Sequence, residues 1–171
     1  MQSHTGHAQD EAIRTVGTKR YQQLPETLNA IRYAMSTPYL VEEFYSRIWN
    51  QGDVSAASEI LTEDFEFRGS LGSELRGVEA FKQYVESVRT PIAGYRCEIL
   101  DCVAEGGRAF AKMRFSGRHV GTFRSFVPTN KQVFWMGAAL FDFANGKIRQ
   151  LWVLGDLAGL DALLEENARS S

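Results

Sequence analysis

The sequence predicts an α+β fold in which a curved antiparallel sheet is covered on one side by about three helices. Helical periodicity fills most of the stretch from about residue 37 to residue 90, apart from one short strand-like segment. Strand-like alternation then continues from about residue 95 to residue 156. In that region two turn signals, Pro128-Thr129-Asn130-Lys131 and Ala144-Asn145-Gly146-Lys147, separate apolar runs and so indicate consecutive antiparallel strands. Helices followed by a run of strands are typical of α+β domains.

The composition favours one globular domain that binds small molecules. The 171 residues are 44% hydrophobic and carry a net charge of -2, which suits a single well-buried core. Lys and Arg are scattered among carboxylates without a basic run, so we expect no nucleic-acid partner. The longest apolar run, Val133 to Phe141, is far shorter than the roughly 20 residues of a membrane span, and the N-terminus lacks the apolar region of a secretory signal. We therefore expect a cytoplasmic protein that does not associate with membranes.

The chain is expected to have three parts. Residues 1–36 are predicted to form an N-terminal extension, a flexible polar arm followed by a short helix from about Leu24. Residues 37–168 are predicted to form the main domain, and residues 169–171 a short tail. The arm contains His4 and His7, but no Cys or carboxylate cluster completes a set of ligands, so we predict no metal site.

Three helices are expected in the main domain. The first starts near residue 37 and is amphipathic, because Leu40, Phe44 and Ile48 recur on one stripe. Asp53 is a candidate cap for a second, short helix. A third helix is expected from about Val78, where apolar residues again recur at helical spacing.

Two ionisable residues stand at the ends of predicted strands. In the strand over residues 108–119, the period of two puts His119 on the same apolar row as Met113 and Phe115. The last predicted strand ends at Asp156, and the leucines that follow predict a short closing helix. In that strand one row contains Asp156 together with Ile148, Trp152 and Leu154.

Both ionisable residues have a catalytic and a structural interpretation. A carboxylate at the end of an apolar strand can have a raised pKa and act as a base near neutral pH, so Asp156 is a candidate base. Alternatively, Asp156 caps the helix that begins at Leu157. His119 either acts as a catalytic acid or base, or it is a core histidine whose hydrogen bonds are satisfied. The working hypothesis is that the sheet brings His119 and Asp156 into one apolar pocket.

Other residues are candidates for binding a ligand. Arg68 precedes a glycine-rich stretch, so it either binds a substrate oxygen or is a solvated residue at a strand end. Large aromatic side chains either wall a flat ligand or fill the core. The predicted substrate-binding residues are Arg68, Tyr45, Trp49, Phe67, Trp135 and Trp152.

Residues 117–156 resemble the SnoaL-like polyketide cyclases, also called ester cyclases, of the nuclear transport factor 2-like superfamily. The similarity extends over about Tyr39 to Leu164 and leaves the N-terminal extension outside it. Three positions depart from the family pattern: Arg118 stands for a Thr, Asn130 stands for a Gly, and a His usually found after the second helix is missing. The matching residues are Gly117, His119, Gly121, Phe123, Pro128, Thr129, Lys131, Gly146, Lys147, Ile148, Trp152 and Asp156.

The resemblance implies a cone-shaped, cystatin-like fold with a pocket inside. It also implies that Asp156 acts as acid or base with His119 nearby, that neither a metal nor an organic cofactor is needed, and that the chain forms a homodimer through the open face of its sheet. The missing His puts the substrate's identity in question, because Arg68 could occupy that region instead.

We therefore expect a cofactor-independent cyclase or isomerase that closes a ring in a polyketide-like, multi-carbonyl hydrophobic substrate. Asp156 would remove a C–H proton between two carbonyls, and His119 would protonate the alkoxide formed by ring closure. Other enzymes of the superfold, a double-bond isomerase or an epoxide hydrolase, are alternatives. A module that only binds a small molecule or dimerises is another, because one fold hosts many functions.

Overall fold

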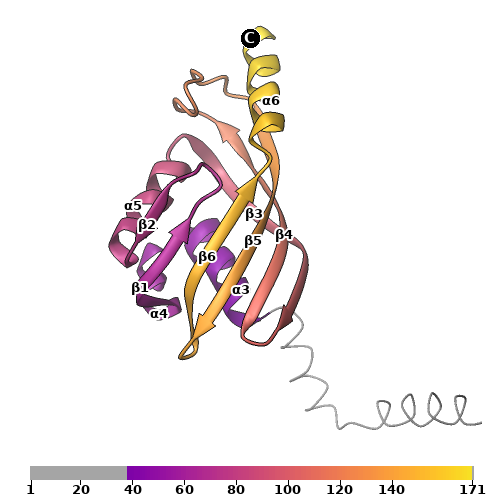
Figure 1. Ribbon diagram of the computed structural model, residues 1–171. Coiled ribbons are helices and arrows are strands. Elements are labelled where there is room, and N and C mark those ends of the chain that lie inside the picture. The colour runs from indigo at the N-terminus through magenta and orange to yellow at the C-terminus, as the bar shows by residue number, and fades with distance from the viewer. Residues whose placement is uncertain (1–37, 171) are drawn as a thin grey trace, which may run out of the picture. The chain divides into compact units, whose positions relative to one another are not determined.

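The computed structural model describes residues 38–170, so the helix predicted from Leu24 and the rest of the extension lie outside the described residues. These residues contain one six-stranded sheet with the strand order β2-β1-β6-β5-β4-β3. Figure 1 shows α3, α4 and α5 on one side of this curved sheet and α6 at the end of β6. The predicted α+β class is therefore confirmed.

The three helices predicted at the start of the main domain are present. Helix α3 (Tyr39–Glu43) continues into a wider, π-helical segment, η1 (Phe44–Gln51), which ends at Gly52 in the left-handed conformation (φ 76°). Asp53 caps the next helical turn by accepting a hydrogen bond from the Ala56 N–H, and η2 (Val54–Ala56) leads directly into α4 (Ala57–Ile60). Helix α5 (Val78–Arg89) buries its apolar stripe of Phe81, Val85 and Val88.

The long antiparallel part of the sheet follows the predicted turns. Strands β3 (Ile92–Glu105), β4 (Arg108–His119), β5 (Gln132–Ala144) and β6 (Lys147–Gly155) pair in sequence order, each antiparallel to the next. Strand β1 (Leu61–Arg68) pairs parallel with β6, and the short β2 (Glu74–Arg76) pairs antiparallel with β1. The parallel pairing and β2 were not predicted, because β1 lies far from β6 in sequence and β2 has only three residues.

The inner face of the sheet packs on the helices and forms the core. Residues on β4 alternate regularly between buried and exposed, and His119 is buried on the same row as Met113 and Phe115, as predicted. The opposite row of β4, with Arg114 and Arg118, is exposed on the outer face.

The predicted row on the last strand is wrong because β6 contains a bulge. Phe143 pairs with Ile148, but the neighbouring Asp142 pairs with Gln150, so one extra residue of β6 lies between them. A shift of one residue exchanges the two faces of a strand. Ile148 is therefore buried with Leu151 and Val153, whereas Trp152, Leu154 and Asp156 are exposed.

An internal aromatic cavity as the candidate functional site

A small cavity lies between the helices and the inner face of the sheet. Its volume of about 20 Å³ is close to what a single water molecule needs. None of the residues that line it carries a charge, so the site is apolar apart from hydroxyl and indole groups. The lining residues are Phe44, Tyr45, Trp49, Phe67, Ser70, Leu71, Tyr84, Val88, Tyr95, Phe115, Trp135, Leu151 and Val153.

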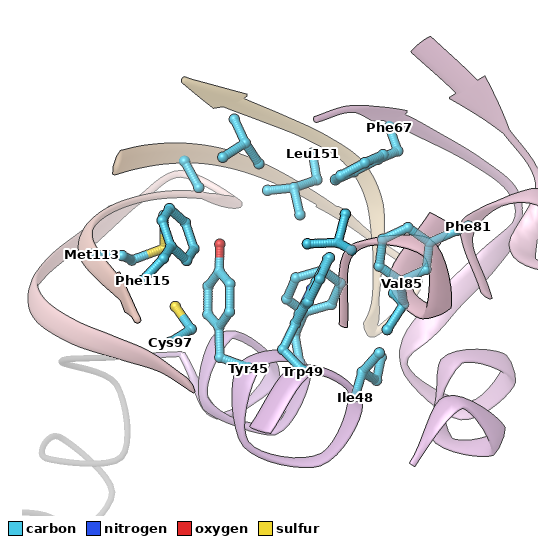
Figure 2. Packing of buried hydrophobic residues seen from close by; sticks show 14 of the residues in the cluster. Tyr45, Ile48, Trp49, Phe67, Phe81, Val85, Cys97, Met113, Phe115 and Leu151 are labelled. Atoms are coloured by element: carbon cyan, nitrogen blue, oxygen red, sulfur yellow. The ribbon is translucent and has the colours of Figure 1, made fainter. Parts of the chain in front are cut away.

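Aromatic contacts fix the walls of this cavity. The rings of Trp49 and Tyr95 lie 5.2 Å apart between centroids, and those of Phe115 and Trp135 lie 5.3 Å apart. Such distances are typical of favourable aromatic pairs. Figure 2 shows Tyr45 and Trp49 reaching from their helix toward Phe115 and Leu151 of the sheet. The cavity therefore presents flat ring faces to whatever occupies it.

The mouth of the cavity is formed by its three half-buried lining residues, Ser70, Leu71 and Tyr84. Burial raises the pKa of Tyr84, and hydrogen bonds from the Leu71 backbone and the Ser70 side chain oppose that rise. Gly69 packs closely against Tyr84, since a Cβ at Gly69 would overlap with the Tyr84 hydroxyl oxygen. The turn after β1 and helix α5 therefore close the mouth together.

Two polar groups inside the cavity lining have no hydrogen-bond partner within the described residues. They are the Tyr45 hydroxyl and the Trp135 Nε1–H, and each belongs to a side chain that is only 3% exposed. Burial raises the pKa of Tyr45 well above its ordinary value, so its hydroxyl stays protonated at neutral pH.

Four of the six predicted substrate-binding residues line this cavity: Tyr45, Trp49, Phe67 and Trp135. Tyr84 and Tyr95 also line it but were not predicted as site residues. A signal was available for Tyr84, because it lies three residues after Phe81 and four before Val88, at helical spacing.

Arg68 and Trp152, the other two predicted binding residues, lie on the outer face instead. They are direct neighbours in the β1–β6 pairing, and Arg68 stacks over the Trp152 ring at 5.3 Å from its centroid. The Arg68 Nη1 also donates a hydrogen bond to the Val153 carbonyl at 2.7 Å. Strand alternation turns both side chains away from the cavity, while the adjacent Phe67 and Leu151 face it.

Asp156 occupies the position that its capping interpretation predicts. It is exposed, and its Oδ1 accepts a hydrogen bond from the Gly159 N–H at 2.9 Å at the start of α6 (Leu157–Arg169). The preceding residue touches the cavity wall: a Cβ at Gly155 would lie 2.9 Å from Ser70 Cβ and 3.5 Å from Trp135 Cδ1. Asp156 therefore follows directly after a residue that packs against Ser70 of the mouth, and Asp156 does not line the cavity itself.

His119 is fully buried but does not line the cavity. Its Nδ1 lies 3.3 Å from the Thr129 hydroxyl, and its Nε2 has no partner within the described residues. His119 and Asp156 lie on opposite sides of β5. The backbone N–H of His119 donates to the Lys131 carbonyl, just before β5 begins, and the backbone N–H of Asp156 donates to the Met136 carbonyl within β5. Lys131 and Met136 are about 17 Å apart along an extended strand. The expected contact between His119 and Asp156 is therefore not found, and the catalytic role of each stays a prediction.

Residues 38–170 contain neither a cluster of metal ligands nor a helix that could span a membrane. In this range no three His, Cys, Asp or Glu side chains come together as ligands for a metal ion. Of the helices described, none is both long and apolar enough to cross a membrane.

Comparisons with known proteins agree with this architecture. The sequence pattern of the SnoaL-like polyketide cyclases matches residues 39–164. TsrD from Streptomyces laurentii is 26% identical, with a TM-score of 0.66 over 73% of this chain and 91% of TsrD. A candidate polyketide cyclase from Acidithiobacillus ferrooxidans is 20% identical, with a TM-score of 0.66 over 75% of this chain and 93% of its own. IdmH from Streptomyces antibioticus, also a candidate polyketide cyclase, is 17% identical, with a TM-score of 0.66 over 74% of this chain and 96% of IdmH. No curated protein matches the chain.

Proposed function

The chain belongs to the SnoaL-like polyketide cyclase family, and on this premise we propose that it is an enzyme that closes a ring in a neutral, multi-carbonyl small molecule. The observation that carries the proposal is the uncharged, aromatic cavity enclosed between sheet and helices. Flat ring faces favour a planar or ring-forming substrate. Family members bind small molecules in a pocket of this fold, which supports the same use of this cavity.

In the proposed reaction Asp156 is the base. Its carboxylate takes a proton from a carbon between two carbonyls, and the resulting enolate carbon attacks a second carbonyl carbon of the same molecule. A C–C bond forms, the carbonyl π bond breaks, and the alkoxide takes up one proton, so product and substrate are isomers. This role is supported by the position of Asp156 directly after Gly155, which packs against Ser70 of the cavity mouth. The carboxylate must first leave its hydrogen bond with Gly159.

For the proton donor we retain His119 as the candidate that the family resemblance supplies. It lies on the inner row of β4, four residues after the cavity residue Phe115. Because it does not border the cavity, we expect His119→Gln to lower the rate less than a change at Asp156 does.

Two substitutions at Asp156 separate its chemical role from its structural one. Asn caps a helix about as well as Asp does, whereas Ala does not. We expect Asp156→Asn to keep the melting temperature and Asp156→Ala to lose about 1 kcal/mol of stability. Both should slow base-catalysed proton removal by about 10²- to 10⁴-fold.

The rate can be measured without knowing the natural substrate. 2-Tetralone is a flat, neutral ketone, and NMR in D₂O follows the exchange of its α-protons. Wild-type protein should accelerate this exchange, and Asp156→Asn should not. An unchanged rate in Asp156→Asn would exclude Asp156 as the base, and no acceleration by the wild type would count against the enzyme proposal for this class of ketone.

A second candidate function is binding without catalysis. It is favoured by one observation, namely that no carboxylate, histidine or lysine lines the cavity itself. This alternative predicts that 2-tetralone binds to the wild type while the exchange of its protons stays at the rate in buffer.

We also propose that the chain forms a homodimer through the outer face of the sheet. An apolar row crosses four strands there, because each of its members is the direct neighbour of the next: Val103, Phe110, Leu140 and Trp152. Three of them are large exposed side chains, at 62% for Val103, 45% for Phe110 and 43% for Trp152. A continuous apolar patch of this kind on a sheet favours a protein interface.

A further inference from the structure

We propose that the Tyr45 hydroxyl and the Trp135 indole N–H are the hydrogen-bond donors that hold the carbonyl oxygens of an uncharged ligand in the cavity. They would then be specificity-determining residues. The inference rests on one part of the proposed function, namely that the cavity is the ligand site.

The first argument is that both groups are buried with no partner in the described part of the chain. Native proteins pair nearly all buried polar side-chain atoms, because each unpaired one loses its hydrogen bonds to water and gains nothing. Two such groups, both on residues that line one small cavity, therefore need an explanation. A ligand with hydrogen-bond acceptors provides it.

The second argument is that both donors are rigidly held. Tyr45 lies on η1, and Asn50 of the same segment forms two hydrogen bonds with the Cys97 backbone of β3, at 2.7 and 3.0 Å. The Trp135 ring is packed between Phe115 and Phe123, at centroid distances of 5.3 and 6.2 Å. Donors that are fixed before binding need no reorganisation when the ligand arrives.

Another hydroxyl in the same lining, that of Tyr84, provides a contrast. Tyr84, at the mouth, has hydrogen bonds with the Ser70 side chain and the Leu71 backbone. A tyrosine of this cavity can thus have hydrogen-bond partners. The two groups of the lining that have none within the described residues belong to Tyr45 and Trp135, which are more deeply buried than Tyr84.

The chemistry of the two groups narrows the ligand class. An indole N–H can only donate, so the ligand must offer an acceptor to Trp135. A carboxylate or ammonium ligand would lose its hydration without gaining an opposite charge, because no charged residue lines the cavity. The ligand is therefore a neutral ring compound with carbonyl oxygens. It must also widen the cavity, and the half-buried residues at the mouth, Ser70, Leu71 and Tyr84, are the ones placed to move.

The test compares two probes of nearly equal shape. 2-Acetylnaphthalene carries a carbonyl oxygen, and 2-ethylnaphthalene does not. We expect the wild type to bind the ketone about five- to tenfold more tightly in calorimetric titrations, which is the usual net value of one or two hydrogen bonds. Tyr45→Phe should remove most of this preference, and Trp135→Phe should reduce it. The charged 2-naphthoate should bind more weakly than either probe.

Tyr84→Phe is the matched control, because it removes a hydroxyl that has partners. It should change the affinity for both probes in the same proportion and lower the melting temperature. Tyr45→Phe should keep or raise the melting temperature, since it removes a buried hydroxyl that is unpaired in the free protein. A purely structural role for the Tyr45 hydroxyl predicts the opposite.

The outcomes separate this inference from the proposed function. If both probes bind equally well, or if Tyr45→Phe leaves the preference for the ketone intact, the donor role is wrong while the cavity remains a ligand site. If neither probe binds, the cavity is not the ligand site and both proposals fail.

Discussion

Arg124 and Asp161 form a two-bond ion pair that ties the connection between β4 and β5 to helix α6. Arg124 Nε lies 2.6 Å from Asp161 Oδ1, and Arg124 Nη2 lies 2.7 Å from Oδ2. Lys131 adds a hydrogen bond from its Nζ to the Asn167 carbonyl at 3.1 Å. Asp156 caps helix α6, so these contacts also hold the segment that follows the proposed base.

The ion pair predicts a specific dependence of stability on pH. Hydrogen bonds from Arg124 hold the pKa of Asp161 below its ordinary value of 3.8. A carboxylate whose pKa is lower in the folded state stabilises the fold above its unfolded pKa, and this contribution is lost as the pH falls through the folded pKa. We expect Asp161→Asn to lower the melting temperature at pH 5 to 7 and to have a progressively smaller effect as the pH falls toward about 2 and Asp161 becomes protonated in the folded state.

Melting curves from pH 2 to 7 check this prediction, with Asp64→Asn as the control. Asp64 is exposed on β1 and has no ion pair among those found in the described residues. Equal effects of the two substitutions at every pH would mean that the Arg124 contact does not stabilise the fold.

Removal of the Asn50 side-chain amide is expected to lower the stability of the fold. Its Nδ2 donates to the Cys97 carbonyl, and its Oδ1 accepts from the Cys97 N–H, so it pairs with backbone groups on the edge strand β3. Asn50→Ala leaves both groups without these partners and should cost about 2 kcal/mol in the free energy of unfolding.

Urea denaturation measures this cost, and the neighbouring Gln51→Ala is the control. Gln51 is exposed, and its side chain donates a hydrogen bond to the Ser46 hydroxyl, so its substitution should stay within about 0.5 kcal/mol of the wild type. If Asn50→Ala changes the free energy of unfolding equally little, other groups or solvent form hydrogen bonds with the Cys97 backbone on β3.

The sequence predicted most of the fold because its local signals agree with its tertiary contacts. The stripe of Phe44 and Ile48, the cap at Asp53 and the turn at Asn145-Gly146 each act over a few residues. The parallel pairing of β1 with β6 was missed because nothing local in residues 61–68 indicates so distant a partner.

The candidate site was predicted less completely, and one bulge explains much of the difference. Strict alternation put Trp152 and Asp156 on the buried row of Ile148, but the extra residue in β6 turned both to the exposed side. A bulge has no reliable sequence signature here, since Arg149 resembles any other exposed strand residue. By contrast, Trp135 and Tyr45 do line the cavity, because large aromatic side chains near a pocket are usually buried in its walls, and their binding role stays a prediction.

The outer face of the sheet provides the last prediction. If the row of Val103, Phe110, Leu140 and Trp152 is a dimer interface, a charge at its centre should prevent association, because Lys would be buried without a partner. We expect Phe110→Lys to be monomeric in light scattering, at the 19.2 kDa of one chain, and the wild type to have twice that mass. Val127→Lys is the control, since Val127 is 70% exposed but lies outside the row, between β4 and β5. A monomeric wild type up to about 100 μM, a concentration at which interfaces of ordinary affinity are occupied, would exclude this face as a stable interface.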